Sequence, residues 1–116
     1  MALEPTQASR LRIYIGESSR YQHRALYEAV VAKAREMGLA GATVMRGLEG
    51  YGHTHRIHST NILTLSGDLP LVIEVIDRPA RVDQFAAVVA DMLDHGLVTV
   101  DAVDVRHYGK STTLPE

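Results

Sequence analysis

Apolar residues near the start of the chain first alternate with polar ones and then recur at helical spacing. In the stretch RLRIYIG, residues 10–16, every second residue is apolar, which is the period of a half-buried strand. The stretch SSRYQHRALYEAVVAKAREMG, residues 18–38, carries an apolar stripe with the period of a helix, made of Leu26, Val30, Ala34 and Met37. Ser18 or Ser19 is available to cap the start of this helix, and Gly38 is placed to end it. A strand followed by a helix is therefore predicted.

The middle of the chain has strand character interrupted by glycine and proline. ATVMRGLEGYG, NILTLSG and PLVIEVID are rich in apolar residues of strand type and are broken by Gly67 and Pro70. A polar segment containing three histidines separates the first of these stretches from the other two. The pattern predicts a long hairpin whose strands lie on either side of this segment.

The last third repeats a helix and a strand. RPARVDQFAAVVADMLDHG has a second helical stripe, with Pro79 suited to its first turn and Gly96 to its C-terminal cap. In LVTVDAVDVRHYG the valines change parity, which predicts a kink or bulge at Asp101 and Ala102 within a final strand.

The predicted element order is β-α-β-β-α-β, and it defines the fold class. This order is typical of the split βαβ, or ferredoxin-like, α+β arrangement, an antiparallel sheet with two helices on one face. We expect one domain over residues 1–116, with a core at about 10–109 and flexible termini at 1–9 and 110–116. Strand residues of both parities are apolar, Leu71 and Val72 for example, so the second sheet face needs a partner, most simply another copy of the chain.

Composition narrows the function classes. The 116 residues include 12 basic and 14 acidic ones, a net charge of −2, which argues against nucleic acid or an anionic membrane as a general partner. The chain has no cysteine, which excludes disulfides, thiolate catalysis and cysteine-ligated metals. Neither a signal peptide nor a membrane-spanning run is found, so we expect a cytoplasmic protein.

Several of these stretches together resemble a known family. RIYIGES, LYEAVVAKAREMGLAGATVMRGLEGYG, DLPLVIEVID and GLVTVDAVDVRHY, between Leu11 and Gly109, resemble the bacterial and archaeal family of unknown function number 190. That family is similar to the PII-like signalling proteins and to the CutA-type proteins. The resemblance implies a homotrimer whose sheets pack around a three-fold axis, with small ligands such as nucleotides bound in clefts between subunits. It also implies that the loop at about residues 52–69 is a T-loop that contacts a partner, such as a membrane transporter.

One departure from the PII pattern concerns phosphate binding. PII proteins carry a glycine-rich phosphate-binding loop before the second helix, whereas this chain passes from Asp77 into the helix through RPAR. Arg78 and Arg81 stand beside a helix N-terminus, where phosphate groups are favoured. The alternative is that both arginines are solvated residues of the first helical turn.

The candidate ligand site lies at the junction between the first strand and the first helix. Hydrogen-bonding side chains gather in GESSRYQHR, at a type of junction where ligands commonly bind. The alternative is helix capping with exposed polar side chains. With the glycines at the T-loop base and the two later arginines, the predicted ligand-binding set is Glu17, Ser18, Arg20, His23, Arg24, Gly47, Gly50, Arg78 and Arg81.

The segment EGYGHTHRIHST, residues 49–60, allows two interpretations. His53, His55 and His58 are close enough in sequence to share a metal ion, although their spacing matches no common metal motif. The other interpretation is a polar, glycine-hinged loop that engages a partner. The residues predicted for this partner loop are Tyr51, Gly52, His53, His55, Arg56 and His58.

No enzyme class gains support from motifs. The chain lacks a Walker A loop, a GxGxxG fingerprint, an HExxH pair and a GxSxG elbow, and it indicates no particular cofactor. The function expected is that of a PII-like regulatory trimer that binds a small anionic effector, such as a nucleotide, and engages a partner through its loop. The alternative is a CutA-like metal-binding or purely structural trimer.

Overall fold

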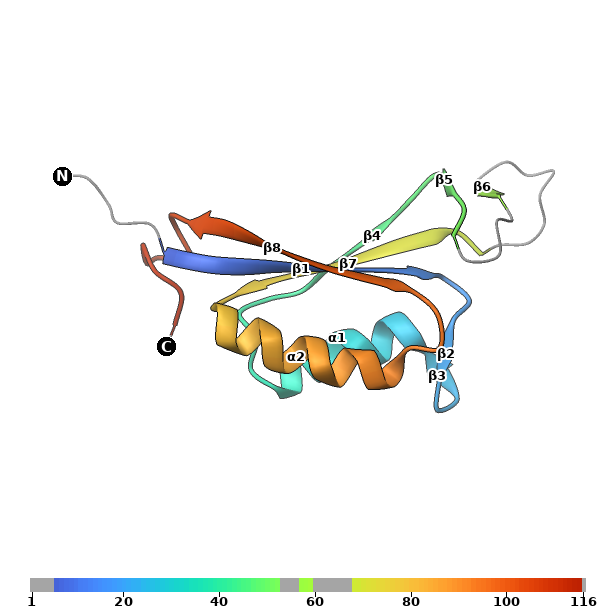
Figure 1. Cartoon of the computed structure of the whole chain (residues 1–116), viewed down its shortest axis with the longest axis horizontal. Coiled ribbons are helices and arrows are strands. Elements are labelled where there is room, and N and C mark those ends of the chain that lie inside the picture. Colours follow the sequence, from blue (N-terminus) through green and yellow to red (C-terminus); the bar gives the residue numbers. More distant parts are fainter. Residues whose placement is uncertain (1–5, 53–56, 60–67, 116) are drawn as a thin grey trace.

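A four-stranded antiparallel sheet carries both long helices on one face. The computed structural model describes residues 6–52, 57–59 and 68–115. The sheet has the strand order β4-β7-β1-β8 and is formed by β1 (Thr6–Gly16), β4 (Thr43–Arg46), β7 (Pro70–Asp77) and β8 (Leu97–Val105). Helix α1 (Leu26–Glu36) follows β1, and α2 (Pro79–Met92) follows β7. Both helices lie on the same side of the sheet (Figure 1), which confirms the predicted α+β, ferredoxin-like class.

The core lies between this sheet and the two helices. Along β7 the residues alternate strictly, with Leu71, Ile73, Val75 and Asp77 buried and the residues between them half-buried. Antiparallel pairing places Ile73 opposite Ile13 and Val75 opposite Leu11, so the apolar residues of both central strands face the helices together. Phe85 and Val89 of α2 and Val30 of α1 are fully buried against them.

A short hairpin stands where the first helix was expected to begin. Strands β2 (Arg20–Tyr21) and β3 (Arg24–Ala25) pair around Gln22 and His23, whose φ values of 47° and 70° suit a two-residue hairpin turn. The helix therefore starts only at Leu26 and has no side-chain cap, so the predicted caps at Ser18 and Ser19 are wrong.

Two glycines were predicted to end the helices; one prediction is confirmed and the other is wrong. Gly38, with φ of 77°, follows α1, and its N–H and that of Leu39 donate to the carbonyls of Arg35 and Ala34, as in a Schellman motif. The predicted cap at Gly96 is wrong, because α2 ends at Met92. Gly96 instead has φ of 142° and lies so close to β1 that an added Cβ would be 3.1 Å from the Tyr14 carbonyl oxygen.

The predicted kink or bulge in the last strand is not supported by the pairing. β8 pairs with β1 in one unbroken register, from Leu97 opposite Tyr14 to Val105 opposite Thr6. A bulge would shift that register by one residue. The change of parity instead places the valines of the two halves of β8 on opposite faces of the sheet.

The face of the sheet without helices is partly apolar and partly charged. Tyr14, Met45 and Leu97 are exposed there by 38, 44 and 57%. Two cross-strand ion pairs lie on the same face, Arg12 Nε to Glu74 Oε2 at 2.9 Å and Arg10 Nη2 to Asp101 Oδ2 at 2.6 Å. The hydrogen bond from Arg10 lowers the pKa of Asp101, and the hydrogen bond to Glu74 raises the pKa of Arg12.

The described residues on both sides of the expected core, 6–9 and 110–115, also contact the fold. Thr6 already belongs to β1, and near the other terminus Leu114 is buried. Arg78 Nη2 donates to the Leu114 carbonyl at 2.8 Å, and Arg78 Nε donates to that of Pro115 at 3.1 Å. The mobility of residues 1–9 and 110–116 in solution stays a prediction.

Neither of the two helices combines the length and the apolar character that crossing a membrane would need, over the ranges that the structure describes.

Candidate functional site

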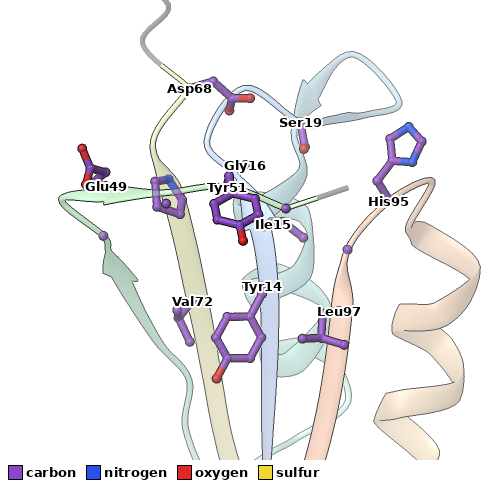
Figure 2. A pocket seen from close by; sticks show the side chains of 15 residues that line it. Tyr14, Ile15, Gly16, Ser19, Glu49, Tyr51, Asp68, Val72, His95 and Leu97 are labelled. Carbon is purple, nitrogen blue, oxygen red and sulfur yellow. The ribbon is translucent and has the colours of Figure 1, made fainter. Parts of the chain in front are cut away.

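A cleft opens at the end of the sheet where β1 stops and β7 and β8 begin. Its volume is about 720 Å³. The segment after β4, which includes β5 (Glu49–Gly50), crosses over this end of the sheet and carries Tyr51 (Figure 2). Below it, Tyr14, Val72 and Leu97 lie side by side on the face without helices. The full lining is Tyr14, Ile15, Gly16, Ser19, Gly47, Glu49, Gly50, Tyr51, Gly52, Asp68, Pro70, Val72, His95, Gly96 and Leu97.

Glycines allow the chain to pass closely over Pro70. A Cβ added at Gly47 would lie 2.8 Å from Pro70 Cγ, and one added at Gly50 would lie 3.2 Å from the same atom. The Gly47 N–H donates to the Pro70 carbonyl oxygen at 2.7 Å, which joins the end of β4 to the start of β7. These contacts place the backbone of residues 47–52 as one wall of the cleft.

The turn that follows β1 forms another part of the lining. The Ser18 N–H donates to Asp68 Oδ1 at 2.9 Å, and the Glu17 N–H donates to the Leu69 carbonyl at 2.8 Å. A Cβ at Gly16 would lie 2.5 Å from Asp68 Oδ1, so the carboxylate occupies the space that any larger residue would need. The Ser18 N–H therefore holds the Asp68 carboxylate at the edge of the cleft, and the Glu17 N–H holds the backbone of the next residue.

The lining is aromatic and apolar at its base, with titratable groups around it. Among the described residues that line the cleft, Glu49 and Asp68 are acidic, His95 is an imidazole, and none is lysine or arginine. Tyr51 has 67% of its surface exposed, which leaves ring area available to a planar ligand. A single chain therefore offers an aromatic surface and hydrogen-bonding groups, but little positive charge.

The residues predicted at the strand-to-helix junction are distributed around the turn and the hairpin. Glu17 lies with its Oε2 atom 2.5 Å from Arg46 Nε, and Ser18 contributes its backbone N–H to Asp68. Arg20 directly follows the lining residue Ser19, and its Nη2 donates to the His23 carbonyl at 2.8 Å. Arg24 instead lies on a separate shallow groove along α1 and β4.

Arg78 and Arg81 do not join this cleft within one chain. They follow the C-terminal end of β7, whereas the cleft lies at its beginning, and the strand Pro70–Asp77 spans about 23 Å. Arg81 donates to the carbonyls of Gly38 and Met37 after α1, and Arg78 bonds to the C-terminal tail. The site that combines these arginines with the loop base was predicted at a cleft between subunits, and it stays a prediction.

The partner loop and the histidine segment are only partly covered by the structure. Gly47, Gly50, Tyr51 and Gly52 line the cleft, as expected for residues at a loop base. His53, His55 and Arg56 lie outside the described residues. His58 belongs to β6 (His58–Ser59), where it pairs with Gly50. Within the described ranges no three metal-ligating side chains come together, and the three-histidine hypothesis remains untested.

Sequence reasoning missed several lining residues. Tyr14 was assigned only to the strand pattern, and Asp68 and His95 lie in connections without a recognisable motif. A signal existed for Tyr14, because a large aromatic residue on the parity opposite to Leu11, Ile13 and Ile15 faces away from the helices. No comparable signal pointed to His95.

Comparison with known proteins establishes the family. Residues 8–105 match the family DUF190, described as an uncharacterised one, so the chain belongs to this family. It is 34% identical over 95 residues to a UPF0166 protein of Aquifex aeolicus, covering 82% of this chain and 90% of that protein. A UPF0166 protein of Methanocaldococcus jannaschii is 26% identical over 95 residues, covering 81% and 87%.

Solved structures establish the PII-like fold. The chain is similar to CPII, a nitrogen regulatory PII-like protein from Thiomonas intermedia K12, bound to ADP, AMP and bicarbonate, with a TM-score of 0.68 and 17% identity. The match covers 90% of this chain and 92% of that one. The apo form of CPII matches with a TM-score of 0.63 and 15% identity, covering 90% and 97%. The predicted resemblance to the PII-like proteins and to this family is therefore confirmed.

Proposed function

We propose that the protein is a PII-like regulatory protein, cytoplasmic and without catalytic activity, that binds a small anionic effector, most simply an adenine nucleotide. The observation that carries this proposal is the cleft at the base of the 52–69 segment, on a fold shared with a protein whose structure holds ADP, AMP and bicarbonate. The aromatic surface of Tyr51 and Tyr14 suits a planar base, which stacks on tyrosine rings with a gain of about 1–3 kcal/mol.

The phosphate groups need cations that the lining itself does not supply. Arg20 and Arg46 directly flank the lining residues Ser19 and Gly47 along the chain, which makes them the first candidates. Arg24, Arg78 and Arg81 reach the same ligand only if they belong to a neighbouring copy. We therefore place the effector between subunits, where the charge of a second chain completes the site.

A homotrimer is the assembly that we propose. The apolar residues on the sheet face without helices, Tyr14, Met45 and Leu97 among them, are exposed in the single chain and gain stability when a copy covers them. Light scattering should give three times the chain mass, and Val72→Glu should reduce it, because Val72 lies in a central strand of that face. A monomer at micromolar concentration would argue against the trimer.

Calorimetric titration of the full chain with ADP, AMP, ATP and bicarbonate tests the effector. Binding of at least one nucleotide supports the proposal, and it should weaken when Arg20 is replaced by alanine. The absence of heat with all four, together with binding of Zn²⁺ or Cu²⁺, would instead favour the metal-binding alternative. In the regulatory case, a partner such as a membrane transporter would engage residues 52–69.

A further inference from the structure

The chain beyond β8 folds back against the end of the sheet where α2 begins. Tyr108 and Ser111 bond to each other through their N–H and carbonyl groups, at 2.8 Å in both directions. The Tyr108 hydroxyl donates to the Ala40 carbonyl at 2.7 Å, and Leu114 is only 3% exposed. Figure 1 shows this end of the chain at the opposite end of the sheet from β5. Residues 106–115, which we call the tail, therefore pack on the fold at the end away from the cleft of the same chain.

Arg78 holds the tail with one edge of its guanidinium group. Nη2 donates to the Leu114 carbonyl at 2.8 Å, and Nε donates to the Pro115 carbonyl at 3.1 Å. Nε and Nη2 lie side by side on the planar group, and such a pair of parallel donors is what a carboxylate or phosphate group engages through two of its oxygens. Two successive peptide carbonyls thus take the place that an oxyanion would occupy.

An oxyanion is a stronger acceptor for Arg78 than the tail is. Peptide carbonyls carry no net charge, so an oxyanion that reached the guanidinium group would add the attraction between opposite charges. The tail lies beyond the last strand of the sheet, and terminal segments open at a lower free energy than core strands do. Leu114 is the one buried residue of the described positions 110–115, so its burial is the main apolar contribution that keeps this part of the tail closed.

We propose that the tail competes with the anionic effector for Arg78. While the carbonyls of Leu114 and Pro115 occupy the edge formed by Nε and Nη2, Arg78 does not offer that edge to an effector in the cleft of a neighbouring copy. Release of the tail exposes the edge and raises the affinity of the neighbouring cleft. Linkage requires that effector binding in turn favours the released tail. The inference rests on the proposed function, since it needs an effector between subunits.

Calorimetric titration with ADP tests this competition in the wild type, in Leu114→Gln, in Arg78→Ala and in the variant with both changes. Glutamine is polar but uncharged, so it disfavours burial of the tail without adding a charge beside Arg78. Leu114→Gln should bind ADP about ten-fold more tightly than the wild type, which corresponds to a tail that is closed roughly nine-tenths of the time. In the Arg78→Ala background the same substitution should change the affinity by less than about two-fold, because the guanidinium group that tail and effector share is absent.

Thr113→Gln is the matched control, because Thr113 is exposed next to Leu114 and receives the same new side chain. It should bind ADP as the wild type does, and urea denaturation should show every variant folded under the titration conditions. NMR of the wild type gives an independent measurement. Saturating ADP should move the Leu114 methyl signals toward the values of an exposed leucine, because the effector favours the released tail.

The possible failures of the proposed function and of the tail competition are distinguishable. If neither the wild type nor Leu114→Gln binds ADP, AMP or bicarbonate, the proposed function fails and this inference with it. If the wild type binds ADP but Leu114→Gln binds it no more tightly, only the competition by the tail is overturned. The same holds if Leu114→Gln tightens binding equally in the absence of Arg78, or if the Leu114 methyl signals stay unchanged at saturating ADP.

Discussion

At the end of β7 the buried carboxylate of Asp77 accepts hydrogen bonds from the Ala40 N–H at 2.9 Å and the Arg78 N–H at 2.7 Å. At the start of the same strand, Pro70 lies beneath two glycines and beside an open cleft. Both ends combine a strand terminus, acidic residues and nearby arginines. At the first end the carboxylate and the arginines bond to the fold's own backbone, whereas at the second Asp68 accepts from the Ser18 N–H but lies at the edge of an open cleft.

The difference shows why charge close to a helix start is weak evidence for a ligand site. Arg81 lies in the first turn of α2, yet its guanidinium donates to the carbonyls of Gly38 and Met37 at the end of α1. Such carbonyls have no partner within their own helix, so an arginine that reaches them stabilises the fold. The cleft instead is lined by backbone and aromatic groups around an open space, which a ligand can fill.

The largest expected effect on stability is at the C-terminal end of β7, where the Asp77 carboxylate bonds to the backbone. Replacing Asp77 by alanine removes the acceptor for two backbone N–H groups and the ion-pair partner of Arg81, whose Nε is 3.4 Å from Asp77 Oδ2. We expect the free energy of unfolding to fall by about 3 kcal/mol, measured by urea denaturation. Asp83→Ala, at an exposed position of α2, is the control and should change it by less than about 0.5 kcal/mol. Equal stability of both variants would contradict this account of Asp77.

Arg81→Ala should have the next largest effect, and it separates stability from binding. Loss of the bonds to the α1 carbonyls should lower the free energy of unfolding by about 2 kcal/mol. Arg81→Lys should recover only part of this, since an ammonium group lacks the planar fork of donors. ADP affinity per folded protein should also fall if Arg81 of a neighbouring copy completes the site proposed between subunits. An unchanged affinity would exclude Arg81 from that site.

Tyr51→Ala, in the cleft at the start of β7, should weaken ligand binding without lowering stability. Because Tyr51 is 67% exposed, its removal should leave thermal stability nearly unchanged. Loss of a stacking surface should weaken ADP binding about ten-fold, or about 1.4 kcal/mol, measured by calorimetry. Leu48→Ala is a matched control, since Leu48 is 75% exposed on the same segment and does not line the cleft. Equal loss of affinity in both variants would remove Tyr51 from the site.

The smallest expected effect concerns an ion pair that belongs to neither of these two ends of β7. Arg10 lowers the pKa of Asp101, so the pair contributes stability above the pKa that Asp101 has in the unfolded chain. This contribution is lost as the pH falls through the lower pKa of the folded state. A carboxyl-detected NMR titration should show the Asp101 pKa rising when Arg10 is replaced by glutamine. An unchanged titration would mean that the pair does not persist in solution, and the pair's exposure to water keeps the effect small.

The fold was largely predictable because short-range sequence patterns indicate its main helices and strands. The alternation in PLVIEVID defined β7 with its observed limits, and Pro79 and Gly38 marked the start of α2 and the end of α1. The hairpin before α1 escaped prediction because Gln22 and His23 adopt positive φ without the Asn-Gly or Gly residues that usually signal such a turn. The predicted bulge in β8 was wrong. A change in hydrophobic parity has two possible causes: an inserted residue, or a strand that buries different faces at its two ends.

The candidate site was only half predictable. Gly47, Gly50, Tyr51 and Gly52 were expected at a loop base and do line the cleft. Asp68 and His95 were not expected, since they come from separate connections that meet only through the strand order β4-β7-β1-β8.

The sequence by itself determined the order of the elements, the residues that face the core and the family, because side-chain period and local backbone preference act between neighbours in the chain. Only the tertiary structure decided which strand ends meet. It separated Arg78 and Arg81 from the cleft by the length of β7 and brought Asp68 to the turn after β1. The reason is that antiparallel pairing fixes contacts through register, and register depends on partners far away in the sequence.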